Sequence, residues 1–246
     1  MPNTISITIK NRSTANQAFL LFQALPNPSN IPADEVFTNV YQRSPTLGGN
    51  ASDQVTFQIT NEYYGIYGTN TASADQKVKI STSGSAKATL QSTPSSGAVN
   101  GSTFHLSTIG GDGISPTFKA TEQTTTAQGA FTIQSDGTFD VQNKGNIYLG
   151  VGATDPKTKT VIPIQTYKAQ PNVTTVLYPV VKYYVAFGHY EPGTVVKKTE
   201  MGKVLILDFT GISLNDVTFT LNDHNEYIID PALAESNLVW STESFA

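Results

Sequence analysis

Residues 61–70 read NEYYGIYGTN, and residues 181–190 read VKYYVAFGHY. Each stretch has two adjacent tyrosines, then three mainly apolar residues, then a glycine. Aromatic and β-branched residues favour strands, and glycine often marks the end of a strand or a close backbone approach. The recurrence predicts one strand motif that is used once in each half of the chain.

Other landmarks recur in the same order, which favours an internal duplication. The paired stretches are ITIKN (7–11) and FDVQN (139–143), FLLFQALPNP (19–28) and YLGVGATDP (148–156), YQRSP (41–45) and YKAQP (167–171), the two tyrosine motifs, KVKISTSG (77–84) and KVLILDFTG (203–211), and TFHL (103–106) and TFTL (218–221). Each single match is weak because β proteins reuse such strands and turns. The shared order carries the argument.

Strand signals dominate the chain, and turn-forming residues separate them. Residues 135–137, Ser-Asp-Gly, predict a hairpin between FTIQ and TFDV. Asp230 and Pro231 predict one short helical turn. We therefore expect an all-β fold of two tandem duplicated antiparallel β-sandwich units, or one large pseudo-symmetric sandwich, with minimal helix. The expected divisions are unit 1 at 1–107, Ser/Thr/Gly-rich connecting strands at 108–138, and unit 2 at 139–246.

The composition disfavours several classes of function. Charged residues make up 14% of the chain and its net charge is −4, so clustered cations for a nucleic acid backbone are missing. There is no cysteine, no His-x-His, no His-Glu-x-x-His and no EF-hand loop, so neither a metal nor a cofactor is expected. No apolar run approaches the roughly 20 residues of a membrane helix, and no secretory signal begins the sequence. We expect a soluble, cytoplasmic protein for which a membrane partner is disfavoured.

The tyrosine motifs have two interpretations. Adjacent strand residues point to opposite faces, so one tyrosine of each pair can pack in the core while the other faces a cleft or solvent. In the structural interpretation the aromatic pair closes a sandwich. In the functional interpretation it forms a stacking platform for a sugar or another flat ligand. The candidate ligand-binding residues are Tyr63, Tyr64, Tyr67, Tyr183, Tyr184 and His105.

Differences between the two halves point to candidate catalytic residues. His189 stands where the first half has Thr69, and it is followed by Tyr190. Asp208 lies in the apolar stretch LILDF, where a carboxylate needs a hydrogen-bond partner or has a perturbed pKa. If the protein is an enzyme, we expect His189, Tyr190 and Asp208 to act in a pocket between the two units.

Three functions remain open from the sequence. The first is a lectin-like β-sandwich that binds carbohydrate or a small neutral or aromatic molecule, because hydroxyl and amide side chains replace charged ones. The second is a cofactor-independent isomerase, cyclase or hydrolase. The third is a β-pore-forming protein whose Ser/Thr-rich stretch 71–138 rearranges at a membrane. A homo-oligomer is compatible with each of the three.

Overall fold

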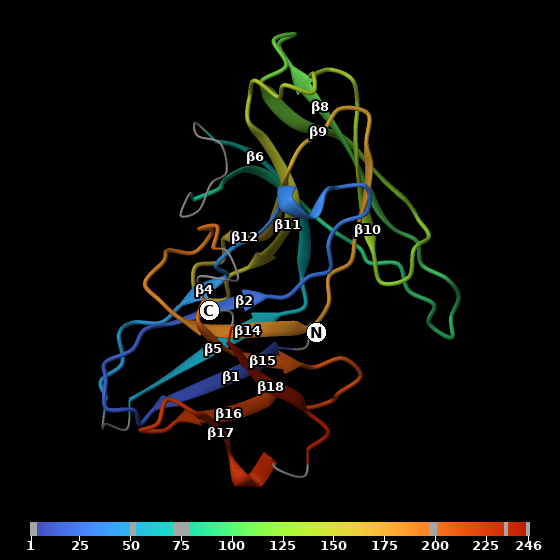
Figure 1. Cartoon of the computed structure of the whole chain (residues 1–246). Coiled ribbons are helices and arrows are strands. Elements are labelled where there is room, and N and C mark those ends of the chain that lie inside the picture. The colour runs from blue at the N-terminus through green and yellow to red at the C-terminus, as the bar shows by residue number, and fades with distance from the viewer. Residues whose placement is uncertain (1–3, 50–52, 71–78, 197–200, 234–235, 245–246) are drawn as a thin grey trace.

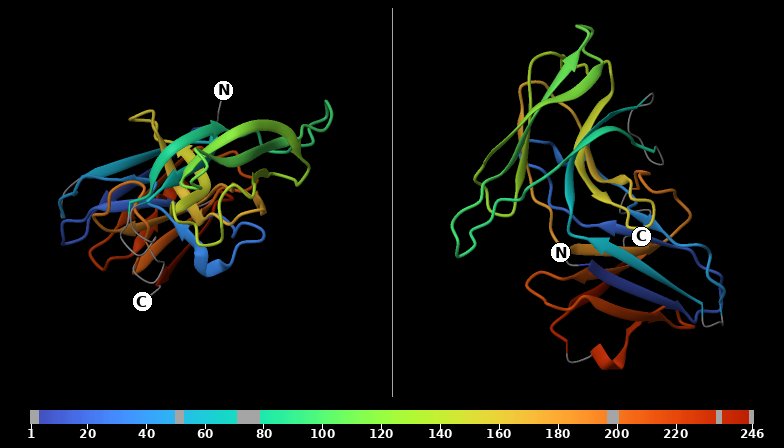
Figure 2. Two further views of the ribbon diagram at one scale, coloured as in Figure 1. Left: turned by 90° about the horizontal axis from the view of Figure 1, so that it is seen from above. Right: turned by 180° about the vertical axis from the view of Figure 1, so that it is seen from behind.

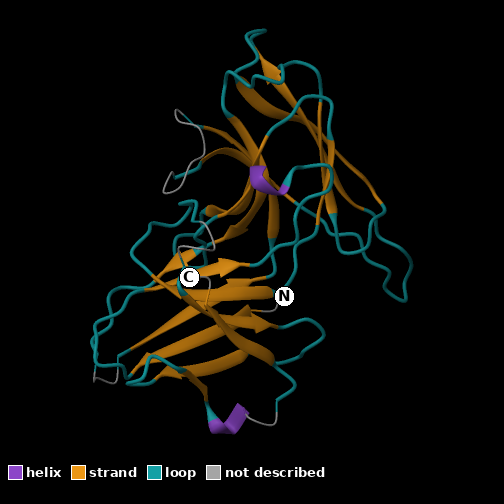
Figure 3. Ribbon diagram, in the orientation of Figure 1, coloured by secondary structure: helices purple, strands orange, loops and turns teal. Residues whose placement is uncertain are grey.

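The computed structural model describes residues 4–49, 53–70, 79–196, 201–233 and 236–244, and within them the chain is almost entirely β (Figures 1 and 3). The expected all-β fold with minimal helix is confirmed. The described helices are two 3-10 turns, η1 (Ala33–Glu35) and η3 (Pro231–Leu233). The second of these is the short turn predicted at Asp230 and Pro231. No helix among the described residues is long and apolar enough to cross a membrane.

Four sheets form two sandwiches, one in the lower and one in the upper half of Figure 1. We call the lower one the terminal sandwich, because it holds the first and the last strands. Its sheet 1 has the order β17 (Tyr227–Ile229), β16 (Asp216–Leu221), β1 (Thr4–Asn11), β5 (Gln54–Thr60). Its sheet 2 has the order β18 (Val239–Ser244), β15 (Lys203–Asp208), β14 (Lys182–Phe187), β2 (Phe19–Gln23), β4 (Gln42–Arg43).

The upper sandwich, which we call the central sandwich, is built mainly from the middle of the chain (Figure 2). Its sheet 3 has the order β3 (Val36–Thr38), β12 (Val161–Lys168), β11 (Ile147–Thr154), β6 (Tyr63–Thr69), β7 (Ser81–Lys87). Its sheet 4 has the order β13 (Thr174–Leu177), β10 (Phe131–Ser135), β8 (Gly101–Ile109), β9 (Ser115–Thr125).

Residue alternation explains why sheet 1 buries one face only. In β1, Ile5, Ile7 and Ile9 are buried, while the residues between them point outward. In sheet 4, Phe104 of β8 stacks on Phe118 of β9 with ring centroids 5.1 Å apart. Phe118 in turn meets Tyr67 of sheet 3 edge-on at 4.8 Å, which joins the two sheets of the central sandwich.

The inner strands β2, β14 and β15 of sheet 2 are buried on both faces, so they are mainly apolar runs. The five residues of β2, FLLFQ, are all buried. On the face away from sheet 1, Leu20 and Phe22 pack with Val196 and Met201, which follow β14 along the chain. This covering layer explains why β2 lacks the polar alternation of β1.

The two sandwiches share most of their strand order, and β18 of sheet 2 and β3 of sheet 3 are the strands without a counterpart. In sheet 1, the central pair β1 and β16 is parallel, and the outer strands β5 and β17 run antiparallel to their neighbours. In sheet 4, the central pair β10 and β8 is parallel, and the outer strands β13 and β9 run antiparallel to their neighbours. The order β15–β14–β2–β4 of sheet 2 corresponds to β7–β6–β11–β12 of sheet 3, with antiparallel pairing throughout. The tyrosine strands β6 and β14 occupy matching places.

Each sandwich combines strands from both predicted units. The terminal sandwich takes β1, β2, β4 and β5 from the start of the chain and β14–β18 from its end. The sheets therefore cross the predicted divisions 1–107, 108–138 and 139–246. Internal duplication stays a prediction, which the matching strand orders support.

The sequence match of ITIKN (7–11) with FDVQN (139–143) does not correspond to a pair of strands in the structure. Residues 138–141 form no strand, and the predicted hairpin at 135–137 is wrong, because β10 pairs with β8 and β13 instead. The physical reason is local: the Asp140 carboxylate accepts hydrogen bonds from the backbone N–H groups of Gln142 and Asn143, which holds the chain in a turn. In sheet 4, β10 has the position that β1 has in sheet 1.

Buried polar side chains join the two sandwiches. The Gln23 amide of β2 donates to the Tyr63 hydroxyl of β6 at 3.0 Å and to the Val180 carbonyl at 2.6 Å. Tyr183 of β14 lies beside Tyr63, and burial, followed by the neighbouring phenols of Tyr63 and Tyr41, raises its pKa. The matched tyrosines of the two motifs thus meet at the seam between the sandwiches.

We predict that Gln23→Ala lowers the free energy of unfolding by about 1–3 kcal/mol, because the Val180 carbonyl and the Tyr63 hydroxyl each lose a hydrogen-bond donor at the buried seam. Urea denaturation followed by tryptophan fluorescence measures the change. The control is Gln58→Ala on the exposed face of β5, expected within about 0.5 kcal/mol of the native protein. Equal effects of the two substitutions would contradict a special role for Gln23.

Candidate functional site

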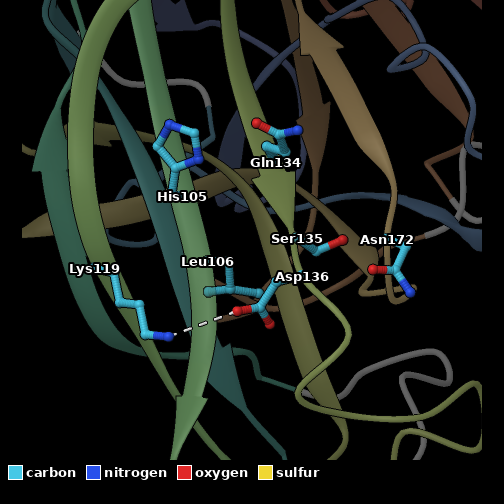
Figure 4. A pocket seen from close by; sticks show the side chains of 7 residues that line it. All are labelled: His105, Leu106, Lys119, Gln134, Ser135, Asp136 and Asn172. Carbon is cyan, nitrogen blue, oxygen red and sulfur yellow. Dashed lines mark ion pairs between the residues drawn. The ribbon is translucent and has the colours of Figure 1, made fainter.

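The outer face of sheet 4 carries the best candidate site. Because Phe104, Leu106 and Ile133 point into the core, their neighbours His105 and Gln134 point outward. These two residues are direct partners in the parallel pairing of β8 with β10. They therefore stand side by side on this face (Figure 4).

A hollow of about 460 Å³ lies on this face. Its size is within the range of about 300–1,000 Å³ that small-molecule sites occupy. Strands β8, β9 and β10 and the loop before β13 supply its walls. The lining residues are His105, Leu106, Lys119, Gln134, Ser135, Asp136 and Asn172 (Figure 4). We call it the β8–β10 hollow.

A charged pair borders the β8–β10 hollow. The Lys119 ammonium lies 3.8 Å from the Asp136 carboxylate. The same carboxylate accepts hydrogen bonds from the backbone N–H of Thr138 at 3.0 Å and from the Thr138 hydroxyl at 2.5 Å. Partial burial acts to raise the pKa of Asp136, but the Thr138 and Ser107 hydrogen bonds and Lys119 outweigh it and lower the pKa below its ordinary value. Asp136 is therefore a fixed anion near neutral pH.

His105 also faces a carboxylate. Its Nε2 atom lies 3.5 Å from Oε1 of Glu122 on β9. The His105 side chain is about one third exposed and that of Glu122 about half exposed. The pair offers a ring nitrogen and a carboxylate oxygen, which together can donate and accept hydrogen bonds.

Two amide side chains in the hollow have no internal partner. Gln134 and Asn172 are both exposed, and within the described part of the chain neither side-chain amide makes a hydrogen bond to another residue. Each amide can donate two hydrogen bonds and accept others. The hollow thus presents unused hydrogen-bonding groups next to a fixed anion and a fixed cation.

The matching face of sheet 1 carries different side chains. Phe219 of β16 pairs with Ile9 of β1 as Phe104 pairs with Ile133, so Thr220 and Lys10 occupy the places of His105 and Gln134. Sheet 4 also has an outer strand, β9, of 11 residues, whereas the corresponding β17 has three. Glu122 lies in the extra length of β9, and Lys119 lies at the register shift of β9 opposite His105 and Leu106. The two faces therefore share a backbone plan and differ in chemistry.

The structure places the candidate tyrosines away from this face. Tyr63 and Tyr183 are buried at the seam, and Tyr67 packs inside the central sandwich against Phe118. Tyr64 is half-buried on β6, and Tyr184 is buried among the apolar residues that cover sheet 2. Adjacent tyrosines do point to opposite faces, since Tyr183 and Tyr184 belong to separate apolar clusters. Of the predicted ligand-binding residues, His105 is the one that lines the β8–β10 hollow.

The candidate catalytic residues are not brought together. His189 is exposed in the loop after β14, and Tyr190 packs nearby on the outer side of sheet 2. Asp208 pairs with Lys182 at the opposite end of β14. At about 3.3 Å per strand residue, His189 and Asp208 lie roughly 20 Å apart.

The Asp208 carboxylate has a local structural role. Its carboxylate accepts a hydrogen bond from the Thr210 backbone N–H at 2.9 Å. Partial burial acts to raise the pKa of Asp208, but the hydrogen bonds from Thr210 and the charge of Lys182 lower it overall. The carboxylate thus stabilises the turn that follows β15.

Sequence reasoning missed most of the hollow. Lys119, Gln134, Asp136 and Asn172 carry no motif, and Asp136 entered only as part of a supposed hairpin turn. The available signal was the likeness of ITIKN (7–11) to FTIQS (131–135), which identifies β10 as the counterpart of β1. Even that signal does not show that β9 and the loop before β13 line the same hollow as β10.

We predict a small acid-dependent loss of stability at Asp136. Its folded-state pKa is lower than the ordinary value of 3.8, so its contribution is fully present above about pH 4 and is lost as the pH falls through the folded-state pKa. Asp136→Asn should lower the free energy of unfolding near pH 6 by less than about 1 kcal/mol, because the side chain is partly exposed. Urea denaturation near pH 6 and near pH 2.5 checks this. A difference between the two proteins that stays constant over this range would contradict the assignment.

Comparison with known proteins identifies a family. A protein-family model described as RhiA matches residues 2–232. The match runs from the start of the terminal sandwich through the whole central sandwich and on to η3. No curated protein and no solved structure matches the chain. Because the match covers nearly all of the sheets, the chain belongs to the RhiA family.

Proposed function

We propose that this protein binds a neutral, polyhydroxylated ligand, a saccharide, in the β8–β10 hollow. The observation that carries the proposal is the lining: the unpaired amides of Gln134 and Asn172 stand beside the Lys119–Asp136 pair and His105. A sugar hydroxyl both donates and accepts hydrogen bonds, and amides, carboxylates and ammonium groups satisfy both roles. The low overall charge of the chain agrees with a neutral ligand.

The difference between the matched sheets supports the same location. A residue needed only for the fold is expected in both sandwiches, as Phe104 and Phe219 are. His105 and Gln134 have Thr220 and Lys10 in their places, so they are not required by the backbone plan. We attribute them to a function that sheet 4 has and sheet 1 lacks.

This proposal keeps the lectin-like hypothesis and changes its mechanism. A stacking platform built on the tyrosine motifs has less support, because Tyr63 and Tyr183 are buried at the seam and Tyr184 is buried among apolar residues. Tyr64 is half-buried on β6, and it does not line the β8–β10 hollow. Recognition in the β8–β10 hollow would rest on hydrogen bonds to the hydroxyl groups of the sugar. Such bonds contribute about 0.5–1.5 kcal/mol each, or about 1.5–3 kcal/mol when one partner is charged.

The alternatives have less support. The enzyme hypothesis needed His189, Tyr190 and Asp208 in one pocket, and His189 and Asp208 lie at opposite ends of β14. The pore-former hypothesis needed the stretch 71–138 to rearrange. Residues 71–78 lie outside the described residues, while β8 and β9 are held in sheet 4 by the stacked rings of Phe104 and Phe118. Cytoplasmic location and homo-oligomerisation stay predictions.

We predict that Gln134→Ala and Lys119→Ala each weaken saccharide binding at least about tenfold, which corresponds to about 1.4 kcal/mol. Both side chains are exposed and outside the core, so the variants should keep the native circular dichroism spectrum and melting temperature. A glycan array finds the saccharide, and isothermal titration with that saccharide measures Kd.

Matched controls come from sheet 1. Lys10→Ala and Thr220→Ala alter the positions that correspond to Gln134 and His105, and they should leave Kd unchanged. If no saccharide on the array is bound by the folded native protein, the proposal is wrong. If the sheet 1 variants lose binding and the sheet 4 variants keep it, the location is wrong.

A further inference from the structure

The β8–β10 hollow continues into a second one on the same face. A hollow of about 280 Å³ is lined by Gln134, which both share, and mainly by threonines. These threonines come from β8, β9, the loop after β9, β10 and β13 and are Thr103, Thr124, Thr125, Thr126, Thr132 and Thr174. We call it the threonine hollow.

Hydroxyl groups in the threonine hollow are held in place by one another. The Thr124 hydroxyl lies 2.8 Å from the Thr103 hydroxyl. The Thr125 hydroxyl lies 2.9 Å from the Thr103 hydroxyl and 2.7 Å from the Thr132 hydroxyl. The chain of hydrogen bonds runs from β9 to β8, returns to Thr125 at the end of β9, and from there reaches Thr132 of β10. Because these groups are already ordered, a ligand that binds them loses little side-chain freedom.

A third hollow follows at the other end. It has a volume of about 280 Å³, and Gly137, next to Asp136 of the β8–β10 hollow, lines it. Its other lining residues come from the loops after β8 and β10 and are Gly111, Asp112, Gly113, Thr138, Phe139, Asp140 and Lys144. We call it the loop hollow. Asp112, Asp140 and Lys144 give it polar walls like those of the central hollow.

Two of the three hollows lie along β10, and the loop hollow lies beyond its end. Thr132 lines the threonine hollow, Gln134 lines both it and the β8–β10 hollow, and Asp136 lines the latter. Residues two apart along a strand are about 6.6 Å apart on one face, so Thr132 and Asp136 are separated by roughly 13 Å. The hollows extend past both residues, so the whole polar run is longer than one sugar ring.

We infer that the three hollows form one groove that binds a linear, neutral oligosaccharide, with its middle residue in the β8–β10 hollow. This inference rests on the saccharide-binding function proposed above and specifies the class of saccharide. An extended peptide is the other elongated ligand to consider. Peptides that bind β-sheets add a strand at an edge, whereas this groove crosses the face of sheet 4, and its walls offer hydroxyls and amides instead of apolar pockets.

The test compares saccharides of increasing length. Linear series of one to six units of glucose, mannose, galactose and N-acetylglucosamine are titrated against the native protein. In the series that binds, the affinity should rise at least about tenfold from one unit to about four units and then stay constant. Thr174→Ala in the threonine hollow and Lys144→Ala in the loop hollow should each remove part of this gain and leave the affinity for the single sugar unchanged.

The controls separate this inference from the function on which it rests. Thr56→Ala, on the exposed face of β5 in sheet 1, should change no affinity. If a single sugar binds as tightly as its hexamer and depends on Gln134, the groove is overturned while the saccharide site stands. If no sugar of any length binds, both are overturned. A peptide array that gives Gln134-dependent binding in place of the sugars would also overturn both.

Discussion

The parallel pairing of β1 with β16 holds the terminal sandwich together. This pairing brings Thr8, near the start of the chain, beside Thr218, near its end. Parallel strands need a long crossover connection, and here most of the chain, including the whole central sandwich, lies within it. Because such contacts join residues that are far apart in the sequence, forming them costs loop-closure entropy. The contacts also need strands from both halves of the chain. The terminal sandwich therefore depends on the complete chain.

The same arrangement explains why the two sandwiches share a seam. Each sandwich takes strands from both halves of the chain, so the chain crosses between them several times. Polar groups at these crossings are buried and need partners, and the Gln23 amide and Tyr63 hydroxyl supply them for each other. Further support comes from the Tyr41 hydroxyl, which donates to the Thr154 carbonyl of β11 at 2.6 Å. Tyr63 and Tyr183, one residue of each tyrosine motif, are therefore part of the packing at this seam.

Sheets 1 and 4 have matching strand pairs but different outward side chains, and this difference supports the location of the candidate site. The core positions Phe104 and Phe219 are the same residue type because both sheets must fill an equivalent space. The outward positions are free of that demand, and there His105 and Gln134 differ from Thr220 and Lys10. The long strand β9 adds Lys119 and Glu122 to the same face. The proposed saccharide groove thus uses the part of the fold that packing leaves unconstrained.

The sequence by itself determined the all-β class, most of the strands, the recurring tyrosine motif and the candidacy of His105. These follow from residue alternation and turn-forming residues, which act over a few neighbouring positions. Only the tertiary structure decided which strands share a sheet, because the alternation in β1 does not show that its neighbours are β5 from its own half and β16 from near the end of the chain. It also decided that Lys119, Gln134, Asp136 and Asn172 meet in one hollow while His189 and Asp208 stay apart. The physical reason is that side-chain pattern specifies which face of a strand is buried, whereas the neighbours of that strand are set by packing between distant segments.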